Sequence, residues 1–446
     1  MIGDDRQFAL PYDHRVPAGR GDVYLDHSAS APVAAVAALA VSAWLTRHGG
    51  GNPSSQHLHG QRARAALDRA RAQLADALGL DTDGWVFCSG ATEGNALALR
   101  GAAEALQRRG AQPGTVAVAA IEHPSLLHPA DALEATGWNR LVLATDDQGR
   151  IDVEAAAAVL ASAPRPWLVA VAAVHHELGV IQPIAALAAA LQRAAVEVDA
   201  AKAPVASVAA TRGPRIARSR PPSAATTPEA ELHLHVDASQ AVGRVPAALW
   251  SDGATTVVVS AHKFGGLAGC GALWLRPGRW IDGQQRGGQE RGLRGGTENL
   301  VGAIAMGAAA SETAARLAAA PALRALRDRL WTSIAALWSG ARRNGPENAG
   351  DETGHLLSVA FPGVDADVLV AALDLEGVAT SAGAACSSGT ATPSPAIAAL
   401  AGAAVARRTV RFSLGPGVDD AAIDRAVEAL RTISERLGVP QSPGRP

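Results

Sequence analysis

The sequence of 446 residues predicts an α/β fold, with a large domain built on a mostly parallel, mixed sheet and a smaller α+β domain. Short apolar runs alternate with alanine-rich helical stretches from about residue 30 to residue 300, as in strands joined by helical crossovers. Hydrophobic residues make up 48% of the chain, which at this length is enough for two or three buried cores.

The expected elements follow from periodicity and from the glycine, proline and polar residues that bound them. Leucines at helical spacing predict a helix over residues 62–78, which Gly79 ends. Short apolar runs predict strands at residues 85–88, 115–121, 167–174, 232–236, 255–259 and 271–275. A long helix or helix pair over residues 302–340 is expected to lead into the smaller domain. That domain contains a strand at 356–361, a helix at 366–375, a glycine- and serine-rich loop at 381–390 and a strand at 409–414.

We expect the large domain to span residues 33–315, and residues 1–32 and 316–446 to form the small domain. Residues 199–231 interrupt the large domain with five prolines, four arginines and no aromatic residue. This composition predicts a long, disordered surface insertion. Contact of its arginines with an acidic partner is the alternative.

Charge and cysteine content exclude several classes of protein. A formal net charge of −2 gives no broad basic surface for nucleic acid. No apolar stretch reaches the roughly 18 residues of a membrane span. Three scattered cysteines do not form a disulfide framework, and residues 1–21 lack the hydrophobic region of a signal peptide. We therefore expect a cytoplasmic protein.

Lysine occurs only twice in the chain, whereas arginine occurs thirty-eight times. Lys263 directly follows a predicted strand, while Lys202 has no catalytic residue types around it. An amine can lose its proton and condense with an aldehyde, which a guanidinium in a protein cannot do. Lys263 is therefore a candidate Schiff-base lysine, for which pyridoxal phosphate is the common aldehyde cofactor. The alternative is a surface lysine.

Polar residues follow several predicted strands, where a parallel sheet binds its ligands. Residues 89–95 combine small side chains with a helix start, which suits a phosphate, although an ordinary capped helix start has the same composition. Asp237 could balance a protonated pyridine nitrogen, with Gln240 donating to the phenolate oxygen, or it could cap the next helix. His123 could stack on a planar cofactor or be structural.

The carboxyl-terminal part of the chain holds a candidate nucleophile. Cys386 lies in a loop of small residues, whereas Cys88 and Cys270 have the apolar surroundings of structural cysteines. Arg411 opens a strand and is a natural bidentate clamp for a substrate carboxylate. The glycine-rich loop 287–299 could supply a phosphate donor across a subunit boundary, or be a polar interface loop.

The histidine pairs do not predict a metal site. His233 and His235, like His175 and His176, have no further histidine or cysteine at ligand spacing. We expect no bound metal ion.

Taken in order, these motifs resemble the cysteine desulfurases of the NifS/IscS type within the class V aminotransferases, which have the fold type I of pyridoxal-phosphate-dependent transferases. The resemblance runs from about residue 24 to residue 415 and is interrupted by the predicted insertion. The matching motifs are residues 24–26, 51–57, 89–95, 122–124, 177–183, 235–237, 262–263, 294–297 and 383–389.

The resemblance implies a homodimer that binds pyridoxal 5'-phosphate. Lys263 would form the imine, Asp237 would pair with the ring nitrogen, Gln240 would meet the phenolate oxygen, and His123 would stack on the ring as a catalytic residue. The residues that would bind the phosphate are Ala91, Thr92, Ser260 and His262, with Thr297 of the partner subunit.

The resemblance also implies a reaction. Arg411 would hold the carboxylate of L-cysteine, and Cys386 as thiolate would take the substrate sulfur as a persulfide and release L-alanine. A sulfur-acceptor protein, such as an iron–sulfur scaffold, would receive the sulfur. The alternatives are a selenocysteine lyase, another class V aminotransferase or lyase in which Cys386 is incidental, and a non-enzymatic cofactor-binding scaffold subunit.

Two segments depart from the family pattern. His175 and His176 stand where relatives have paired asparagines, and His176 is expected beside the cofactor oxygen and the substrate carboxylate. The segment 26–30 reads Asp-His-Ser-Ala-Ser in place of Asp-Asn-Ala-Ala-Thr. We expect these changes to affect how the substrate fits the site and how the activity depends on pH.

Overall fold

The structure is a computed structural model that describes residues 22–202, 231–285, 287–383 and 393–439. Its main feature is a seven-stranded sheet in the order β2-β8-β7-β6-β5-β3-β4, in which only β8 runs antiparallel to its neighbours. The strands are β2 (Trp85–Cys88), β3 (Thr115–Ala119), β4 (Asn139–Leu143), β5 (Trp167–Ala172), β6 (Leu232–Asp237), β7 (Thr256–Ser260) and β8 (Gly271–Leu275).

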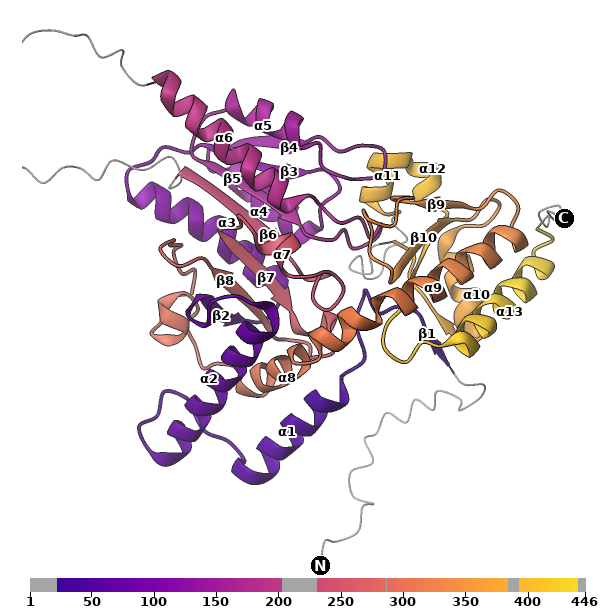
Figure 1. The fold of residues 1–446 in the computed structure, drawn as a ribbon, viewed down its shortest axis with the longest axis horizontal. Helices are drawn as coiled ribbons and strands as arrows, with labels where there is room; N and C mark the ends of the chain where they lie inside the picture. The colour runs from indigo at the N-terminus through magenta and orange to yellow at the C-terminus, as the bar shows by residue number, and fades with distance from the viewer. Residues whose placement is uncertain (1–21, 203–230, 286, 384–392, 440–446) are drawn as a thin grey trace, which may run out of the picture.

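Helices cover both faces of this sheet (Figure 1). One apolar core lies under α3 (Ala91–Arg108) and α4 (Pro124–Glu134). The core on the other face involves α1 (Ala35–His48), α2 (Leu58–Leu78), α5 (Val153–Ala161), α6 (Ile184–Lys202), α7 (Ala248–Ser251) and α8 (Leu300–Ala310). Since β2, β3, β5 and β7 are buried throughout, their sequences are mainly continuous apolar runs rather than alternating ones. β6 is equally buried but carries His233, His235 and Asp237 between its apolar residues.

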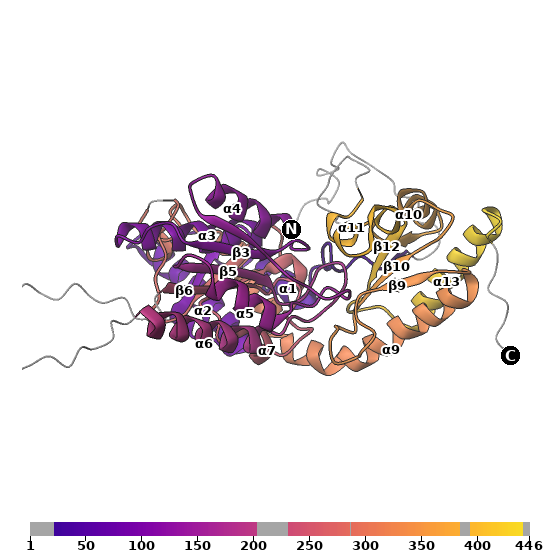
Figure 2. The same cartoon turned by 90° about the horizontal axis from the view of Figure 1, so that it is seen from above.

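Another, separate core lies around a three-stranded antiparallel sheet in the order β12-β10-β9. The elements of this region, which includes a two-stranded β1-β11 sheet, are β1 (Val23–Tyr24), α9 (Thr313–Leu337), β9 (Arg342–Asn344), β10 (Leu356–Ala360), α10 (Ala366–Leu375), β11 (Val378–Ala379), β12 (Thr409–Ser413) and α13 (Asp420–Arg436). Two short helices, α11 (Pro395–Ala401) and α12 (Ala403–Ala406), pack instead against Leu178 and Val180 in a small cluster of their own. In Figures 1 and 2, α9 extends from the large sheet to the small one. The separate cores support our proposed division into two domains, and the proposed boundary after residue 315 falls in the first turn of α9.

The predicted fold class is confirmed, and the six predicted strands of the large sheet are present with small shifts at their ends. The sequence did not predict β4, because this edge strand begins with Asn139 and Arg140 and is only partly buried. Residues 302–340 contain α8 and α9, so the helix pair is the correct alternative.

The first residues of the predicted disordered insertion are helical instead. Helix α6 continues to Lys202, so residues 199–202 are helical, while residues 203–230 lie outside the described part of the chain. Arg165 forms ion pairs with Asp199 and Glu231, which brings the two described ends of the interruption together.

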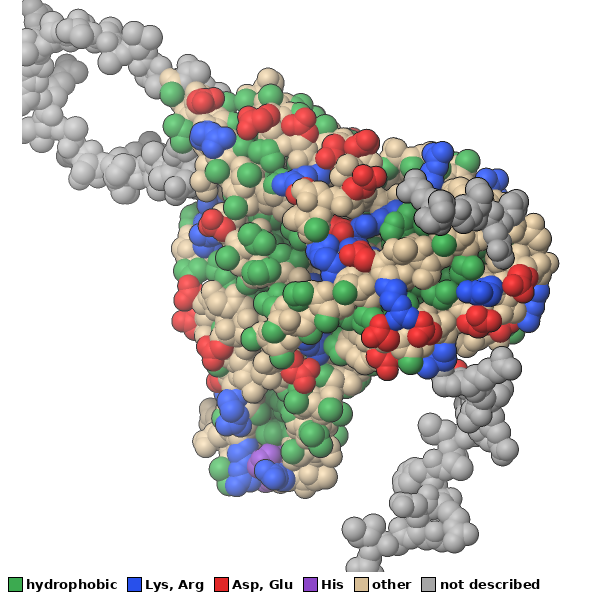
Figure 3. All heavy atoms as spheres, turned by 45° about the vertical axis from the view of Figure 1, so that its right-hand side comes forward, with side chains coloured by type: hydrophobic (Ala, Val, Ile, Leu, Met, Phe, Trp, Pro, Cys, Tyr) green, Lys and Arg blue, Asp and Glu red, His purple; other side chains and the backbone are tan. Residues whose placement is uncertain are grey.

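Acidic and basic side chains are interspersed on the face of the molecule in Figure 3, and no large patch of one sign is visible there. None of the helices in the described segments has the length and apolar character that a membrane crossing requires.

Candidate active site

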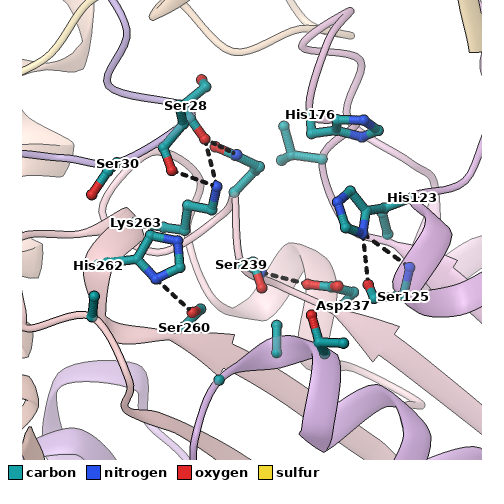
Figure 4. Close-up of a pocket in the computed structure, with 18 of the residues that line it drawn as sticks. Ser28, Ser30, His123, Ser125, His176, Asp237, Ser239, Ser260, His262 and Lys263 are labelled. Atoms are coloured by element: carbon teal, nitrogen blue, oxygen red, sulfur yellow. Dashed lines mark hydrogen bonds between the residues drawn. The ribbon is translucent and has the colours of Figure 1, made fainter. Parts of the chain in front are cut away.

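A cavity of about 600 Å³ lies at the carboxyl ends of the strands and receives side chains from both proposed domains. It is lined by residues that the sequence singled out: Ala91, Thr92, His123, His176, Asp237, Gln240, Ser260, His262, Lys263 and Arg411. Thr297 is exposed and does not line this cavity. Cys386 lies outside the described residues. Figure 4 shows how the central residues surround the cavity.

The start of α3 forms one end of the cavity and suits an anion. Its N-cap, Gly90, provides no side-chain cap, so the first backbone N–H groups have no capping side chain. A Cβ atom on Gly271 would lie 2.6 Å from the Cα of Gly90, so this close approach of β8 and α3 requires glycine. Ser260 and His262 complete the surroundings, with Ser260 Oγ 3.1 Å from His262 Nδ1.

The glycine-rich loop reaches this end of the cavity from the same chain through Arg294. Arg294 Nε donates to Glu93 Oε1 at 3.0 Å, and Glu93 Oε2 accepts the Ser89 N–H at 2.7 Å. Arg294 therefore offsets the carboxylate of Glu93, which lines the cavity.

Asp237 ends β6 and lies in the floor of the cavity. Its Oδ1 accepts the Ser239 N–H at 2.9 Å, and its Oδ2 accepts from Asn95 Nδ2 at 2.7 Å. Two N–H donors stabilise a carboxylate, which is the form that would pair with a protonated pyridine nitrogen. Asp237 thus does more than cap the turn that follows β6, because its second oxygen is held by Asn95.

His123 lies beside Asp237 in Figure 4. Its Nδ1 is 2.8 Å from Ser125 Oγ and accepts the Ser125 N–H at 3.1 Å. Burial and, to a smaller extent, the adjacent His176 together lower the pKa of His123 to about 4. The two imidazole rings meet edge to face, with centroids 5.1 Å apart. His123 is therefore a neutral imidazole near pH 7.

Lys263 lies in a short 3-10 helix, η3 (Ala261–Lys263), directly after β7. Its Nζ donates to the carbonyl oxygens of Ser28 and Ala29 at 2.7 and 2.8 Å. Gln240 Nε2 also donates to the Ser28 carbonyl, at 2.9 Å. The segment 26–30, which departs from the family pattern, is thus the wall against which both groups lie.

The two adjacent histidines have different environments. His175 is buried, its Nε2 donates to the Ile121 carbonyl at 2.8 Å, and burial lowers its pKa to about 3, so it is structural. His176 lines the cavity, and its Nε2 is 3.3 Å from Glu177 Oε1. Burial raises the pKa of Glu177, but hydrogen bonds from His176 and Ser394 outweigh it and lower the value to about 2.

Arg411 lies on β12 of the small sheet, and its side chain reaches the part of the chain that forms the large sheet. Its Nη2 donates to Asp26 Oδ1 at 2.8 Å, and its Nη1 donates to the His176 carbonyl at 3.1 Å. Its buried Nε has no hydrogen-bond partner among the described residues. These two hydrogen bonds fix Arg411 at the cavity wall, where its guanidinium group is paired with the carboxylate of Asp26.

The remaining cysteines are buried, as expected. Burial raises the pKa of Cys270 to about 12 and that of Cys88 further still, so neither is a thiolate near pH 7. Among the described residues, no three histidine, cysteine, aspartate or glutamate side chains form a group that could hold a metal ion.

Sequence reasoning gave no role to several residues that shape the site, namely Asp26, Asn95, Ser125, Glu177 and Ser239. His176, which the sequence analysis placed at the site, lines the cavity together with Ala172 and Val174, and this spacing is the period of an extended chain. The same periodicity would have placed His175 on the opposite side. For Asn95 the signal was weaker: it is a polar residue on a helical face that is otherwise buried and apolar.

The donor set fits pyridoxal 5'-phosphate. An uncapped helix start with hydroxyl groups suits the phosphate, Asp237 suits a protonated ring nitrogen, and the amine of Lys263 suits an aldehyde.

Comparisons with known proteins agree with this fit. Residues 23–208 and 224–426 match the family model described as aminotransferase class-V. The chain is 34% identical to a cysteine desulfurase of Cereibacter sphaeroides, covering 93% of this chain and 96% of that protein. It is 31% identical to the cysteine desulfurase IscS of Dictyoglomus turgidum, covering 93% and 95% of the two chains.

Solved structures show the same fold. A NifS-like protein aligns with a TM-score of 0.78 at 24% identity, over 93% of this chain and 100% of that one. DndA from Streptomyces lividans aligns with a TM-score of 0.65 at 31% identity, over 86% and 97% of the two chains. The chain belongs to the class V aminotransferases, a family that uses pyridoxal 5'-phosphate, and is related within it to the cysteine desulfurases.

Proposed function

We propose that the protein is a cysteine desulfurase, which removes the sulfur of L-cysteine as a persulfide on Cys386 and releases L-alanine. The observation that carries this proposal is the convergence of Lys263, Asp237, His123 and Arg411 on one cavity, although they come from four separate segments of the chain. Relatives named cysteine desulfurase at 31–34% identity support it.

In this proposal each residue has a distinct task at the cofactor. Bound pyridoxal phosphate supplies an electron sink for the charge that develops at the substrate Cα. The amine of Lys263 holds the aldehyde, and Asp237 keeps the ring nitrogen protonated. Gln240 donates to the phenolate oxygen. The proposed phosphate ligands are Ala91, Thr92, Ser260 and His262, with Thr297 of the partner subunit.

At the substrate, Arg411 binds the carboxylate and His176 donates a hydrogen bond beside it. His123 presents a neutral imidazole that can move a proton. The thiolate of Cys386 attacks the substrate Sγ, so an S–S bond forms as the C–S bond breaks. The electron pair of the broken bond stays on the three-carbon product, which takes a proton to become alanine, so no outside oxidant is needed.

Contacts on both sides of residues 384–392 support the role of Cys386. Before this stretch, Ser381 pairs with the backbone of Arg411, and its Oγ donates to Asp26 Oδ2 at 3.0 Å. After it, Ser394 Oγ donates to Glu177 Oε1 at 2.8 Å. Ser381 and Ser394, which flank this stretch in the sequence, are therefore held by carboxylates that also contact Arg411 and His176 of the cavity wall.

We also propose a homodimer, because Thr297 is exposed and outside the cavity of its own chain. Leu39 and Leu45 on α1 and Leu58 at the start of α2 are 69%, 51% and 56% exposed, which suits a surface that a second copy covers. The persulfide sulfur would pass to an acceptor protein, for which an iron–sulfur scaffold is our first candidate. Light scattering should give twice the chain mass, and a monomer would contradict the dimer.

The test is to incubate the cofactor-loaded protein with L-cysteine and dithiothreitol and to measure sulfide and alanine. We expect Lys263→Ala and Cys386→Ala each to leave less than about 1% of the sulfide rate, the first without a covalently held cofactor and the second with one. Cys270→Ala is the matched control, because this buried thiol should be dispensable. A wild-type protein that binds the cofactor but makes no alanine from L-cysteine would contradict the proposal.

A further inference from the structure

A chain of side-chain hydrogen bonds runs beneath the cavity floor, and Asn95 is its centre. Asn95 lies in the second turn of α3 and is 0% exposed. Its Nδ2 is 2.7 Å from Asp237 Oδ2 and 2.8 Å from Ser125 Oγ, and its Oδ1 is 2.7 Å from His235 Nε2. One amide therefore connects β6 to α4, and hence Asp237 to His123.

The direction of each hydrogen bond follows from the chemistry of the groups. A carboxylate only accepts, so the Asn95 atom that faces Asp237 is the amide nitrogen, and its oxygen faces His235. The second amide hydrogen points at Ser125 Oγ, which then accepts and has its own hydrogen left for His123 Nδ1, 2.8 Å away. His123 Nδ1 accepts the Ser125 N–H as well, so the ring carries its proton on Nε2.

The other end of the chain holds the Asn95 oxygen in place. His235 Nε2 donates to it, so His235 Nδ1 accepts from Thr256 Oγ1, 2.8 Å away. Thr256 Oγ1 in turn lies 2.9 Å from His233 Nε2, which donates to it. Burial lowers the pKa of His235 to about 4, against the raising effect of Asp237, so its ring is neutral and donates from one nitrogen only. If the Asn95 amide were flipped, its NH2 group would face the N–H of His235, so that two donors would meet.

We propose that Asn95 is a positioning residue that sets the hydrogen-bonding states of Asp237 and His123 together. Through one amide hydrogen it holds Asp237 as an acceptor toward the ring nitrogen of the cofactor. Through the other it makes the Ser125 hydroxyl donate to His123, which keeps the His123 proton on Nε2. The inference rests on the proposed roles of Asp237 and His123, but on no step of sulfur transfer.

Four variants of the cofactor-loaded protein separate the two halves of this role. Asn95→Ala removes both donors. Asn95→Asp keeps the shape but supplies at most one hydrogen to Asp237 and Ser125. Ser125→Ala cuts only the branch to His123. Asn344→Ala is the control, because this amide also makes two side-chain hydrogen bonds, at 3.1 and 3.2 Å, but lies in the small sheet away from the cavity.

Two readouts are needed, and neither depends on turnover. The first is the nitrogen NMR signal of the His123 ring and its titration, assigned by its loss in His123→Gln. The charged or titratable groups around this ring are His176, Asp237, Lys263 and Glu177. The second is the affinity for pyridoxal phosphate, measured by absorbance titration.

We expect Ser125→Ala to raise the His123 pKa by about 0.5–1 unit and to leave cofactor affinity within about twofold. Asn95→Ala should raise that pKa similarly and also weaken cofactor binding by about tenfold, the effect of one hydrogen bond to a charged group. Asn95→Asp should change at least one of the two readouts, and Asn344→Ala should change neither.

An Asn95→Ala protein that is folded, binds cofactor as the wild type does and keeps the His123 signal would overturn the inference. If Asn95→Ala does not fold, Asn95→Asp with both readouts unchanged overturns it equally. A wild-type protein that binds no cofactor would instead contradict the site itself. Failure of the wild type to release sulfide would contradict only the proposed desulfurase reaction.

Discussion

Buried neutral histidines surround the cavity, and each of them binds fewer protons in the folded protein than in the unfolded chain. Burial is the largest cause of the low pKa of His175, about 3, and of the values of about 4 for His27, His123 and His235. In His175, His123 and His235 an unprotonated ring nitrogen accepts a hydrogen bond that a second ring proton would disturb. Part of the acid sensitivity of the protein should therefore originate at its active site.

Stability should rise with pH between roughly 4 and 6.5, because over this window the unfolded chain binds the additional protons. We expect the free energy of unfolding to fall by several kcal/mol from pH 7 to pH 5, measured by urea denaturation. Glu122 acts in the opposite direction. Burial raises its pKa to about 8, so the stability contributed by its protonated form is lost as the pH rises from about 4.5 to 8. Because one glutamate acts against several histidines, the free energy of unfolding should still rise with pH over this window.

His175→Gln is the variant that tests this origin. A glutamine Nε2 can donate to the Ile121 carbonyl in place of the imidazole, but it does not titrate. The variant should show a smaller loss of stability between pH 6.5 and pH 5 than the wild type. An identical loss would show that His175 does not contribute to the acid sensitivity.

At the scale of elements, the start of α3 depends on its contact with β8. Gly271→Ala would place a Cβ atom 2.6 Å from the Gly90 Cα and force the two segments apart. We expect a loss of about 1–3 kcal/mol in stability from this overpacking. Affinity for pyridoxal phosphate should fall at least about tenfold, because the N–H groups at the helix start would move away from the phosphate. Absorbance titration with the cofactor measures this.

Gly350→Ala is the matched control, since the nearest atom to its added Cβ would be 3.9 Å away in the side chain of Asn348. It should bind the cofactor as the wild type does. Equal affinity of the Gly271→Ala protein would contradict the role given to this contact.

Strands buried on both faces were predictable from sequence because burial makes them continuous apolar runs ended by polar residues. Those same end positions identified Asp237 and Lys263. β4 was missed because an edge strand does not need an apolar sequence. Asn95 was missed because a buried polar residue within a helix is recognised only by its partners, and these are 30 and 142 positions away along the chain.

At the scale of the whole molecule, residues 351–353 join the part of the chain around the large sheet to the part around the small sheet. The Ile181 N–H donates to the Asp351 carbonyl at 2.8 Å, and the Thr353 N–H donates to the Gly179 carbonyl at 2.9 Å. Between them, Glu352 is buried, and its carboxylate is the acceptor for three arginines, namely Arg324 and Arg327 of α9 and Arg343 of β9. Residues 179–181 follow His176 and Glu177 closely in the chain. We therefore expect this junction to determine the position of Arg411 relative to the cavity.

Glu352→Gln should be strongly destabilising, because it removes the carboxylate that pairs with Arg324 and Arg343 and leaves the buried Arg327 with only the exposed Asp328. We expect a loss of about 3–5 kcal/mol in the free energy of unfolding, measured by urea denaturation near pH 7. Asp420→Asn is the control: it removes one partner of Arg329 in an exposed ion pair, where solvent screens the charges and no measurable change is expected. If the two sheets move relative to each other in Glu352→Gln, Arg411 moves with the small sheet, so affinity for L-cysteine should fall more than affinity for the cofactor. Equal losses of both affinities would instead indicate general unfolding, and unchanged stability would show that the three arginines do not depend on Glu352.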